Sequence, residues 1–203
     1  LKYETVPDSW QRLGGRALIA RILVDEVPGT CEPLGNYNKV IFAPGLLVGH
    51  MLSSCDRISI GGKSPLTNGV KEANAGGTTG LQLACLGIKA LILENRPASS
   101  EWWVLRLSRK GISFDQADDL VGLGVFEAAT ILQKRYGEKN AIALIGIGGE
   151  MRMATAGIQN LDKDKLPSRI AARGGLGAVM ASKGIKAIVI DSQGTQKPEI
   201  LNP

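Results

Sequence analysis

One short sequence motif occurs twice in the chain, and this repeat constrains the fold more than any other feature. Residues 75–80 hold a glycine pair and lead to Gly-Ile-Lys-Ala and an aliphatic run at residues 87–94; residues 173–177 lead in the same way to residues 184–191. The spacing between the glycine pair and the later run differs by one residue, which indicates an approximate duplication rather than a repeat array. We therefore expect two related units, each a glycine loop, short helix, turn and strand, with pseudo-twofold symmetry.

The composition is that of a folded chain with its own core. The 203 residues are 44% hydrophobic and 21% charged, which is ordinary for a globular protein of this size. The net charge of +5 suits an anionic ligand or an acidic partner. Aromatic residues make up only 4% of the chain and do not alternate with basic ones, which argues against a nucleic-acid partner.

The cellular setting follows from the cysteines and the apolar runs. Cys31, Cys55 and Cys85 are odd in number and far apart, which is typical of reduced thiols rather than of a disulfide framework. The longest apolar runs have the length of a strand, and no charged-then-apolar leader opens the chain. We therefore expect a cytoplasmic protein without a membrane partner.

Periodicity predicts a fold with more strands than helices. One helix follows a cap at Asp8 or Ser9 and ends before Pro28, and another covers residues 125–136, where Gly137 stops it. Strands are predicted at residues 40–43, 57–60, 90–93, 102–107, 141–145 and 187–190. Because strands and helices do not alternate regularly, the pattern favours an α+β fold. Residues 94–100, rich in polar residues and proline, form the expected loop between two halves.

The glycine loops also suggest a ligand. A glycine turn that opens a helix directs free backbone N–H groups and the positive end of the helix dipole outward, which favours phosphate. Arg57 precedes the first loop, while Arg169 and Arg173 flank the second, and guanidinium groups bind phosphate in a bidentate manner. The repeat therefore predicts two phosphate sites. The alternative is that the glycines serve only as turns and the arginines are solvated, because a duplicated structural unit has the same pattern.

Other reactive residues do not form a catalytic set. His50 is the only histidine and has no evident orienting partner. Cys55 lies near Arg57 in the sequence, which would favour its thiolate, but a small packed residue is the more common role. The pair Asp118 and Asp119 fits the start of a helix better than a pair of catalytic carboxylates. We therefore predict no catalytic residue in this chain.

The same segments resemble a known family. Residues 57–67 (RISIGGKSPLT), 73–77 (ANAGG), 87–90 (GIKA) and 169–180 (RIAARGGLGAVM) are similar, in order and spacing, to the N-terminal domain of tungsten-containing aldehyde ferredoxin oxidoreductases. The resemblance covers nearly the whole chain. It implies one pterin-cofactor-binding domain over residues 1–203, an α+β fold with two mixed β-sheets in a pseudo-twofold saddle and a few helices, whose halves meet near residues 95–100.

The resemblance also implies a cofactor and its ligands. In the family, a tungsten ion is held by two pterin dithiolenes of the molybdopterin type, whose phosphates are bridged by magnesium; molybdenum is the alternative metal. The main-chain carbonyls of Asn74 and Ile170 match the magnesium ligands, and carbonyl oxygens suit that ion. The residues that match cofactor contacts are Arg57, Gly76, Arg169, Ala172 and Arg173. The sequence departs from the family at Ile170 and Ala172, where alanine and glycine are usual, and the extra methyl group at Ala172 could crowd the cofactor.

The implied reaction is the oxidation of aldehydes to carboxylic acids, with ferredoxin as the electron acceptor. In the family, later domains supply the acid/base residues and the cysteines of a [4Fe–4S] cluster, and the three separated cysteines of this chain cannot replace them. We therefore expect activity only when the chain is joined to the remaining domains or subunits, and a homo-oligomer is a further arrangement left open. One alternative is a noncatalytic scaffold or assembly subunit, which Ile170 and Ala172 favour. Another is a nucleotide-binding enzyme, although the chain lacks the Gly-x-Gly-x-x-Gly pattern with its acidic ribose ligand.

Overall fold

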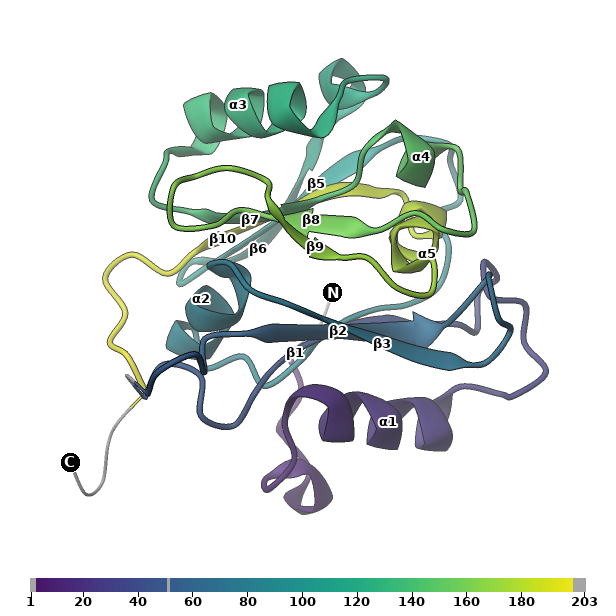
Figure 1. Ribbon diagram of the computed structural model, residues 1–203, viewed down its shortest axis with the longest axis horizontal. Coiled ribbons are helices and arrows are strands. Elements are labelled where there is room, and N and C mark those ends of the chain that lie inside the picture. Colours follow the sequence, from purple (N-terminus) through teal and green to yellow (C-terminus); the bar gives the residue numbers. More distant parts are fainter. Residues whose placement is uncertain (1–2, 51, 199–203) are drawn as a thin grey trace.

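The computed structural model describes residues 3–50 and 52–198, which form two packed β-sheets (Figure 1). The first sheet has the order β3-β2-β1-β4 and only antiparallel pairs; it contains β1 (Val40–Pro44), β2 (Ile58–Lys63), β3 (Val70–Ala75) and β4 (Leu91–Leu93). The second sheet has the order β6-β5-β10-β7-β8-β9; it contains β5 (Trp103–Ser108), β6 (Gly111–Gln116), β7 (Ala141–Leu144), β8 (Ile158–Asn160), β9 (Arg169–Ala171) and β10 (Ile185–Asp191). Its β5–β10 pair is parallel, so mixed pairing occurs in this sheet alone among the described strands.

Helices cover the outer faces of the sheets and also lie between them (Figure 1). The first sheet is covered by α1 (Gly15–Glu26) and the second by α3 (Val125–Tyr136). Between the sheets lie α2 (Thr79–Cys85) and α5 (Leu176–Ser182). The remaining helical segments are α4 (Ile147–Glu150) and two short 3₁₀ helices, η1 (Asp8–Trp10) and η2 (Asp118–Leu120). The predicted α+β fold is confirmed.

The central core joins the two sheets into one body. Phe42 and Ile60 of the first sheet and Ile188 of the second belong to the same buried cluster, together with Leu83 of α2 and Val179 of α5. Two further clusters lie outside, one beneath α1 and one beneath α3. Strands with a buried face on each side read as continuous apolar runs, which is why most of them were found in the sequence.

The duplication extends well beyond the repeated phrase. The order α1-β1-β2-β3-α2-β4 recurs as α3-β7-β8-β9-α5-β10, with α4 inserted between β7 and β8, and the strand order β3-β2-β1-β4 matches β9-β8-β7-β10. Both outer helices have 12 residues, and each follows a 3₁₀ helix that starts with aspartate. The turns at Gly87 and Gly184 have the same backbone conformation, with φ of 71° and 72°. The β5–β6 hairpin and α4 are therefore additions to the second unit.

Two predictions about elements need correction. The first helix does not start from Asp8 or Ser9, because the chain forms η1 there and α1 begins only at Gly15. Between them Gly14 has an extended backbone, and a Cβ atom on it would lie 2.7 Å from the main-chain nitrogen of Leu46, so this interruption leaves room only for glycine. The strands β3, β6, β8 and β9 were not predicted. They are short or carry exposed polar residues, so they lack the apolar pattern that identifies a strand.

Among the described residues, none of the helices combines the length and apolarity needed to cross a bilayer.

Candidate functional site

The edges of the two sheets meet at β3 and β9. Each is the outermost strand of its sheet, and the two lie side by side (Figure 1). Asn74 pairs with Ser59 in one sheet, and Ile170 pairs with Gln159 in the other, so Asn74 and Ile170 occupy equivalent positions of the repeat. An edge strand leaves part of its main-chain carbonyls without a partner in the sheet. Carbonyl oxygens of both halves are therefore available near each other.

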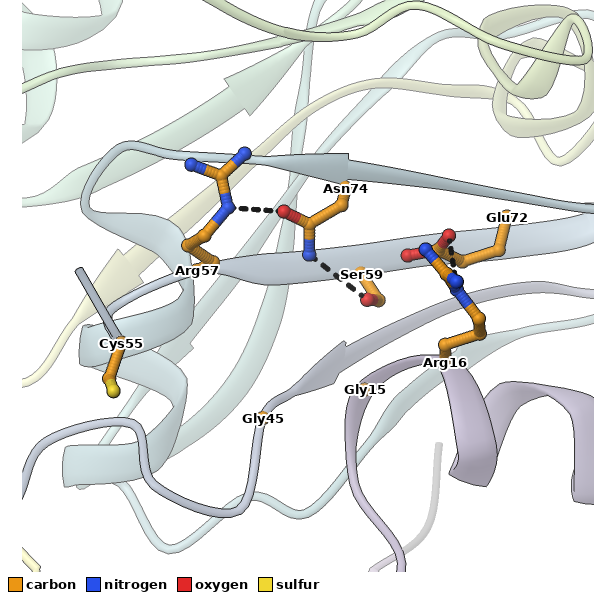
Figure 2. Close-up of a pocket in the computed structure, with 8 residues that line it drawn as sticks. All are labelled: Gly15, Arg16, Gly45, Cys55, Arg57, Ser59, Glu72 and Asn74. Atoms are coloured by element: carbon orange, nitrogen blue, oxygen red, sulfur yellow. Dashed lines mark hydrogen bonds and ion pairs between the residues drawn. The ribbon is translucent and has the colours of Figure 1, made fainter.

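Two arginines converge on the first glycine loop. A Cβ atom on Gly76 would lie 3.6 Å from Cδ of Arg169 and 3.8 Å from Nη1 of Arg57, so the glycine leaves room between the two side chains. Arg57 precedes β2 and donates through Nε to Oδ1 of Asn74, and Nδ2 of Asn74 donates to Oγ of Ser59 over 3.3 Å (Figure 2). Within residues 3–50 and 52–198, Arg57 uses its Nε alone as a side-chain donor, so both of its terminal nitrogens remain available for an anion.

The first glycine loop is attached to the opposite sheet. The main-chain nitrogen of Thr78 donates to the carbonyl oxygen of Leu161 over 3.0 Å, and Oγ1 of Thr79 donates to Oδ1 of Asn160 over 2.8 Å. Gly77 has φ of 101°, and a Cβ atom there would lie 2.6 Å from the oxygen of Leu161. Only glycine fits this approach. The loop that was predicted to bind phosphate is thus held rigidly between the halves.

The second glycine loop likewise packs against the first half. Gly174 and Gly175 have φ of 76° and 68°, and a Cβ atom on Gly174 would lie 2.6 Å from Cβ of Lys71 on β3. Ala172 and Arg173 are exposed on this loop. In the part of the chain that the structure describes, the side chains of Arg169 and Arg173 make neither a hydrogen bond nor an ion pair, so both guanidinium groups are free to bind a ligand.

A structured loop leads into Arg169. The carboxylate of Asp162 accepts hydrogen bonds from Oγ of Ser168, from the main-chain nitrogen of Leu166 (3.0 Å) and from that of Asp164 (2.9 Å). These bonds, that of Ser168 first, lower the pKa of Asp162 below its ordinary value because they favour the charged form. Arg169 therefore follows an ordered turn, which lowers the entropic cost of ligand binding.

A pocket of about 340 Å³ adjoins Arg57 and Asn74 (Figure 2). Its remaining lining residues are Gly15, Arg16, Gly45, Cys55, Ser59 and Glu72. Sequence reasoning named only Arg57, Asn74 and Cys55 of this set. The others come from the start of α1, the residue after β1, strand β2 and the edge strand β3, and no local motif connects such distant segments. Among the described residues, histidine, cysteine and acidic side chains form no group that could hold a metal ion.

Comparison with known proteins identifies the fold's relatives. Residues 1–192 match the family described as aldehyde ferredoxin oxidoreductase, N-terminal domain. This chain belongs to that family. The resemblance inferred from the glycine segments is confirmed, and the chain spans about a third of the length of its curated relatives.

The relatives of this family domain are large oxidoreductases. The tungsten-containing aldehyde ferredoxin oxidoreductase of Pyrococcus furiosus is 34% identical over 193 residues, which cover 95% of this chain and 30% of that enzyme. The aliphatic sulfonate oxidoreductase, WOR-like subunit, of the same organism is 30% identical over 197 residues, which cover 89% of this chain and 30% of that protein. Among solved structures, the active-site complex BamBC of benzoyl coenzyme A reductase with 1,5-dienoyl-CoA contains a chain that superposes with a TM-score of 0.85 and 32% identity, over 96% of this chain and 28% of that one.

Proposed function

We propose that this chain is the cofactor-binding N-terminal domain of an aldehyde ferredoxin oxidoreductase-like enzyme and holds a tungsten, or molybdenum, bis-pterin. The observation that carries the proposal is the convergence of Arg57 and Arg169 on Gly76 between the edge strands β3 and β9. Two guanidinium groups from different halves, beside a residue without a side chain, fit a phosphorylated ligand that lies across the junction.

Each predicted residue has a binding role in this proposal. Arg57, Arg169 and Arg173 would bind the phosphates, while Gly76, which has no side chain, and Ala172, which has only a methyl group, would lie against the cofactor. The main-chain carbonyls of Asn74 and Ile170, equivalent in the repeat, would hold the bridging magnesium ion as hard oxygen ligands. The bound cofactor would supply two-electron redox chemistry, and the residues of this chain would bind and orient it.

The complete reaction requires parts of the protein outside this domain. We propose that remaining domains or subunits supply the [4Fe–4S] cluster, acid/base residues and contact with ferredoxin, in the cytoplasm. Aldehyde oxidation to the carboxylic acid is proposed because several relatives carry that name. Other relatives are named for aliphatic sulfonate and for benzoyl coenzyme A, so the substrate depends on those further parts.

Metal and pterin analysis of the complete protein tests this function. The wild-type protein should retain tungsten or molybdenum with two pterins per metal. Arg169→Ala should lower the retained metal and pterin at least about tenfold, because a charged hydrogen bond to phosphate is lost. Arg21→Ala is a matched control, since Arg21 lies on α1 and pairs with Asp25. Equal cofactor content in both variants would refute the proposed role of Arg169.

A scaffold that has kept the fold without the cofactor is the second candidate. Ile170 is 46% exposed at the position of a proposed carbonyl ligand, where the family usually has alanine, so a large apolar side chain stands beside the proposed site. If the protein is such a scaffold, the wild-type protein should lack metal, and the double variant Ile170→Ala, Ala172→Gly should bind metal. Metal in the wild-type protein would rule out this candidate.

A further inference from the structure

A buried asparagine joins the two halves beside the proposed phosphate site. Asn160 of β8 is fully buried. Because alternate residues of a strand lie on the same face, its side chain lies on the side of Ile158, a member of the central core. A buried amide is unfavourable unless its donor and acceptor groups find partners. The partners of Asn160 come from both halves of the molecule, and both belong to segments that form the site.

The hydrogen bonds of Asn160 close a ring around the site. Its Oδ1 accepts from Oγ1 of Thr79 over 2.8 Å, and its Nδ2 donates to the main-chain oxygen of Arg169 over 3.2 Å. Thr79 lies three residues after Gly76, whose Cβ position is 3.6 Å from Cδ of Arg169. These contacts lead from Gly76 along the glycine loop to Asn160, on to Arg169, and from its side chain back to the start.

The repeat shows that the fold itself does not require a polar pair here. By strand register, Asn160 corresponds to Ile60 of β2. Thr79, the first residue of α2, corresponds to Leu176, the first residue of α5, and both helices lie between the sheets (Figure 1). Ile60 and Leu176 are apolar members of the central core. The polar pair therefore has a role that is specific to the junction of the first glycine loop with β9.

Arg169 depends on this restraint because its own surroundings hold it weakly. It begins β9, an edge strand of three residues. A bidentate contact with phosphate needs a guanidinium group in a fixed place and plane, since hydrogen bonds weaken when they are misaligned. A shift of the main chain of Arg169 relative to the glycine loop would therefore weaken the contact even though the arginine itself is unchanged.

We propose that Asn160 is a positioning residue of the site: it holds the main chain of Arg169 to the first glycine loop and thereby sets the place of the guanidinium group. The inference rests on the proposed function, in which Arg169 binds phosphate. It adds a residue that acts through Arg169 rather than on the ligand. The hydrogen bond from Thr79 is part of the same device, because it fixes the amide of Asn160 to the opposite half.

A double substitution separates positioning from stability. Thr79→Val with Asn160→Leu replaces both polar side chains by apolar ones of similar shape, so neither is left with an unpaired polar atom. The double variant should unfold at a denaturant midpoint close to that of the wild type, whereas Thr79→Val alone should unfold earlier. Its affinity for inorganic phosphate, measured by calorimetry on the cofactor-free complete protein, should nevertheless fall about tenfold, because Arg169 is no longer held in place.

Two further variants serve as controls. Thr79→Ser keeps the hydroxyl group and should keep the phosphate affinity of the wild type. Asn140→Leu removes another buried asparagine, whose Nδ2 donates to the carbonyl oxygen of Tyr136 over 2.7 Å within the second half. This variant should unfold earlier than the wild type and still bind phosphate with unchanged affinity.

The outcomes distinguish this proposal from the proposed function. Phosphate affinity at the wild-type level in the double variant would overturn the role of Asn160, and so would an equal loss of affinity in Asn140→Leu, since affinity would then follow stability alone. If the double variant does not fold, Thr79→Val and Thr79→Ser are compared instead, and equal affinities reject the proposal. Arg169→Ala reports separately on the proposed function: lower affinity in that variant, with wild-type affinity in the double variant, would retain the site and reject only the role of Asn160.

Discussion

At the scale of single residues, a buried ion pair anchors the second half. Lys186 on β10 is fully buried and its Nζ donates to Oε1 of Glu150, whose Oε2 accepts from the main-chain nitrogen of Gly122 over 2.9 Å. Its repeat counterpart Lys89 donates instead to the carbonyl oxygen of Gln11 over 2.8 Å. Both lysines of the repeated Gly-Ile-Lys-Ala thus tie a strand region to the segment that precedes an outer helix. The motif is explained by structure rather than by ligand binding.

Removal of one partner from this pair should be strongly destabilising. Glu150→Gln leaves the ammonium group of Lys186 buried without its counter-charge, and we expect the free energy of unfolding to fall by about 3–5 kcal/mol. Asp119→Asn, which breaks the exposed pair with Arg135, should change it by less than about 1 kcal/mol. Denaturant unfolding of both variants measures the difference, and similar values would show that burial of the Lys186 pair has no special effect.

Lys183 should make the stability depend on pH. Burial, helped by the charge of Arg96, lowers the pKa of Lys183 to about 8, although its Nζ donates to the carbonyl oxygen of Gly35 over 2.8 Å. Between pH 8 and 10 the unfolded chain therefore binds more protons at this site than the folded protein does, so stability from this group rises with pH.

The comparison with Lys183→Met isolates this effect. Relative to the variant, the wild-type protein should gain about 1–2 kcal/mol of unfolding free energy as the pH rises from 7 to 10. Denaturant unfolding across that range gives the difference curve. A flat curve would mean that Lys183 titrates at the same pH in the folded and unfolded states.

At the scale of elements, the contact of α1 with its sheet depends on a glycine. A Cβ atom on Gly61 of β2 would lie 2.3 Å from Cγ2 of Ile19 and 3.0 Å from the carbonyl oxygen of Lys71, so the helix packs directly on the backbone of the strand. Ile19 is fully buried in the cluster beneath α1. The position of α1 matters for the site because its first residues, Gly15 and Arg16, line the pocket.

Enlargement of this glycine should displace the helix. We expect Gly61→Ala to lower the unfolding free energy by about 1–3 kcal/mol, since well-packed contacts cannot accept a methyl group without movement. Gly29→Ala is the matched control: no atom lies within 4 Å of its Cβ position, so its stability should stay within about 0.5 kcal/mol of wild type. Thermal unfolding compares the two, and an equal response would argue against tight packing at Gly61.

At the scale of the whole molecule, the two halves are joined at the site itself. The buried hydrogen bond from Thr79 of α2 to Asn160 of β8 crosses from one half to the other beside the first glycine loop. The shared core between the sheets adds apolar contacts from both. Stability of the junction and geometry of the site are therefore coupled.

Loss of this cross-half bond should affect stability and ligand binding together. Thr79→Val keeps the shape of the side chain but removes the donor, and we expect a loss of about 1–3 kcal/mol in unfolding free energy because Oδ1 of Asn160 is left unpaired. Affinity for inorganic phosphate should fall as well. Ser99→Ala, in the exposed loop that connects the sheets, is a control expected to change neither quantity. Unchanged phosphate affinity in Thr79→Val would separate the junction from the site.

The sequence alone was enough for the fold class, most buried strands and α3, because apolar periodicity and glycine stops are local signals. The sequence also identified the last third of each repeat, because the motif around Gly87 and Gly184 requires the same left-handed turn in both copies. The family followed from the same glycine and arginine segments. These inferences share one property: residues close in the sequence carry them.

Only the tertiary structure disclosed the full duplication, the edge strands and the pocket. The front parts of the two units have diverged in side chains, as Gly15 and Val125 illustrate, and keep only their backbone arrangement. The edge strands β3 and β9 are held by hydrogen bonding to their neighbours and by contact with each other. Neither interaction requires an alternating apolar sequence. The meeting of Arg57 and Arg169 at one junction depends on how two sheets pack. Packing of distant segments is decided by the shared core rather than by any local pattern.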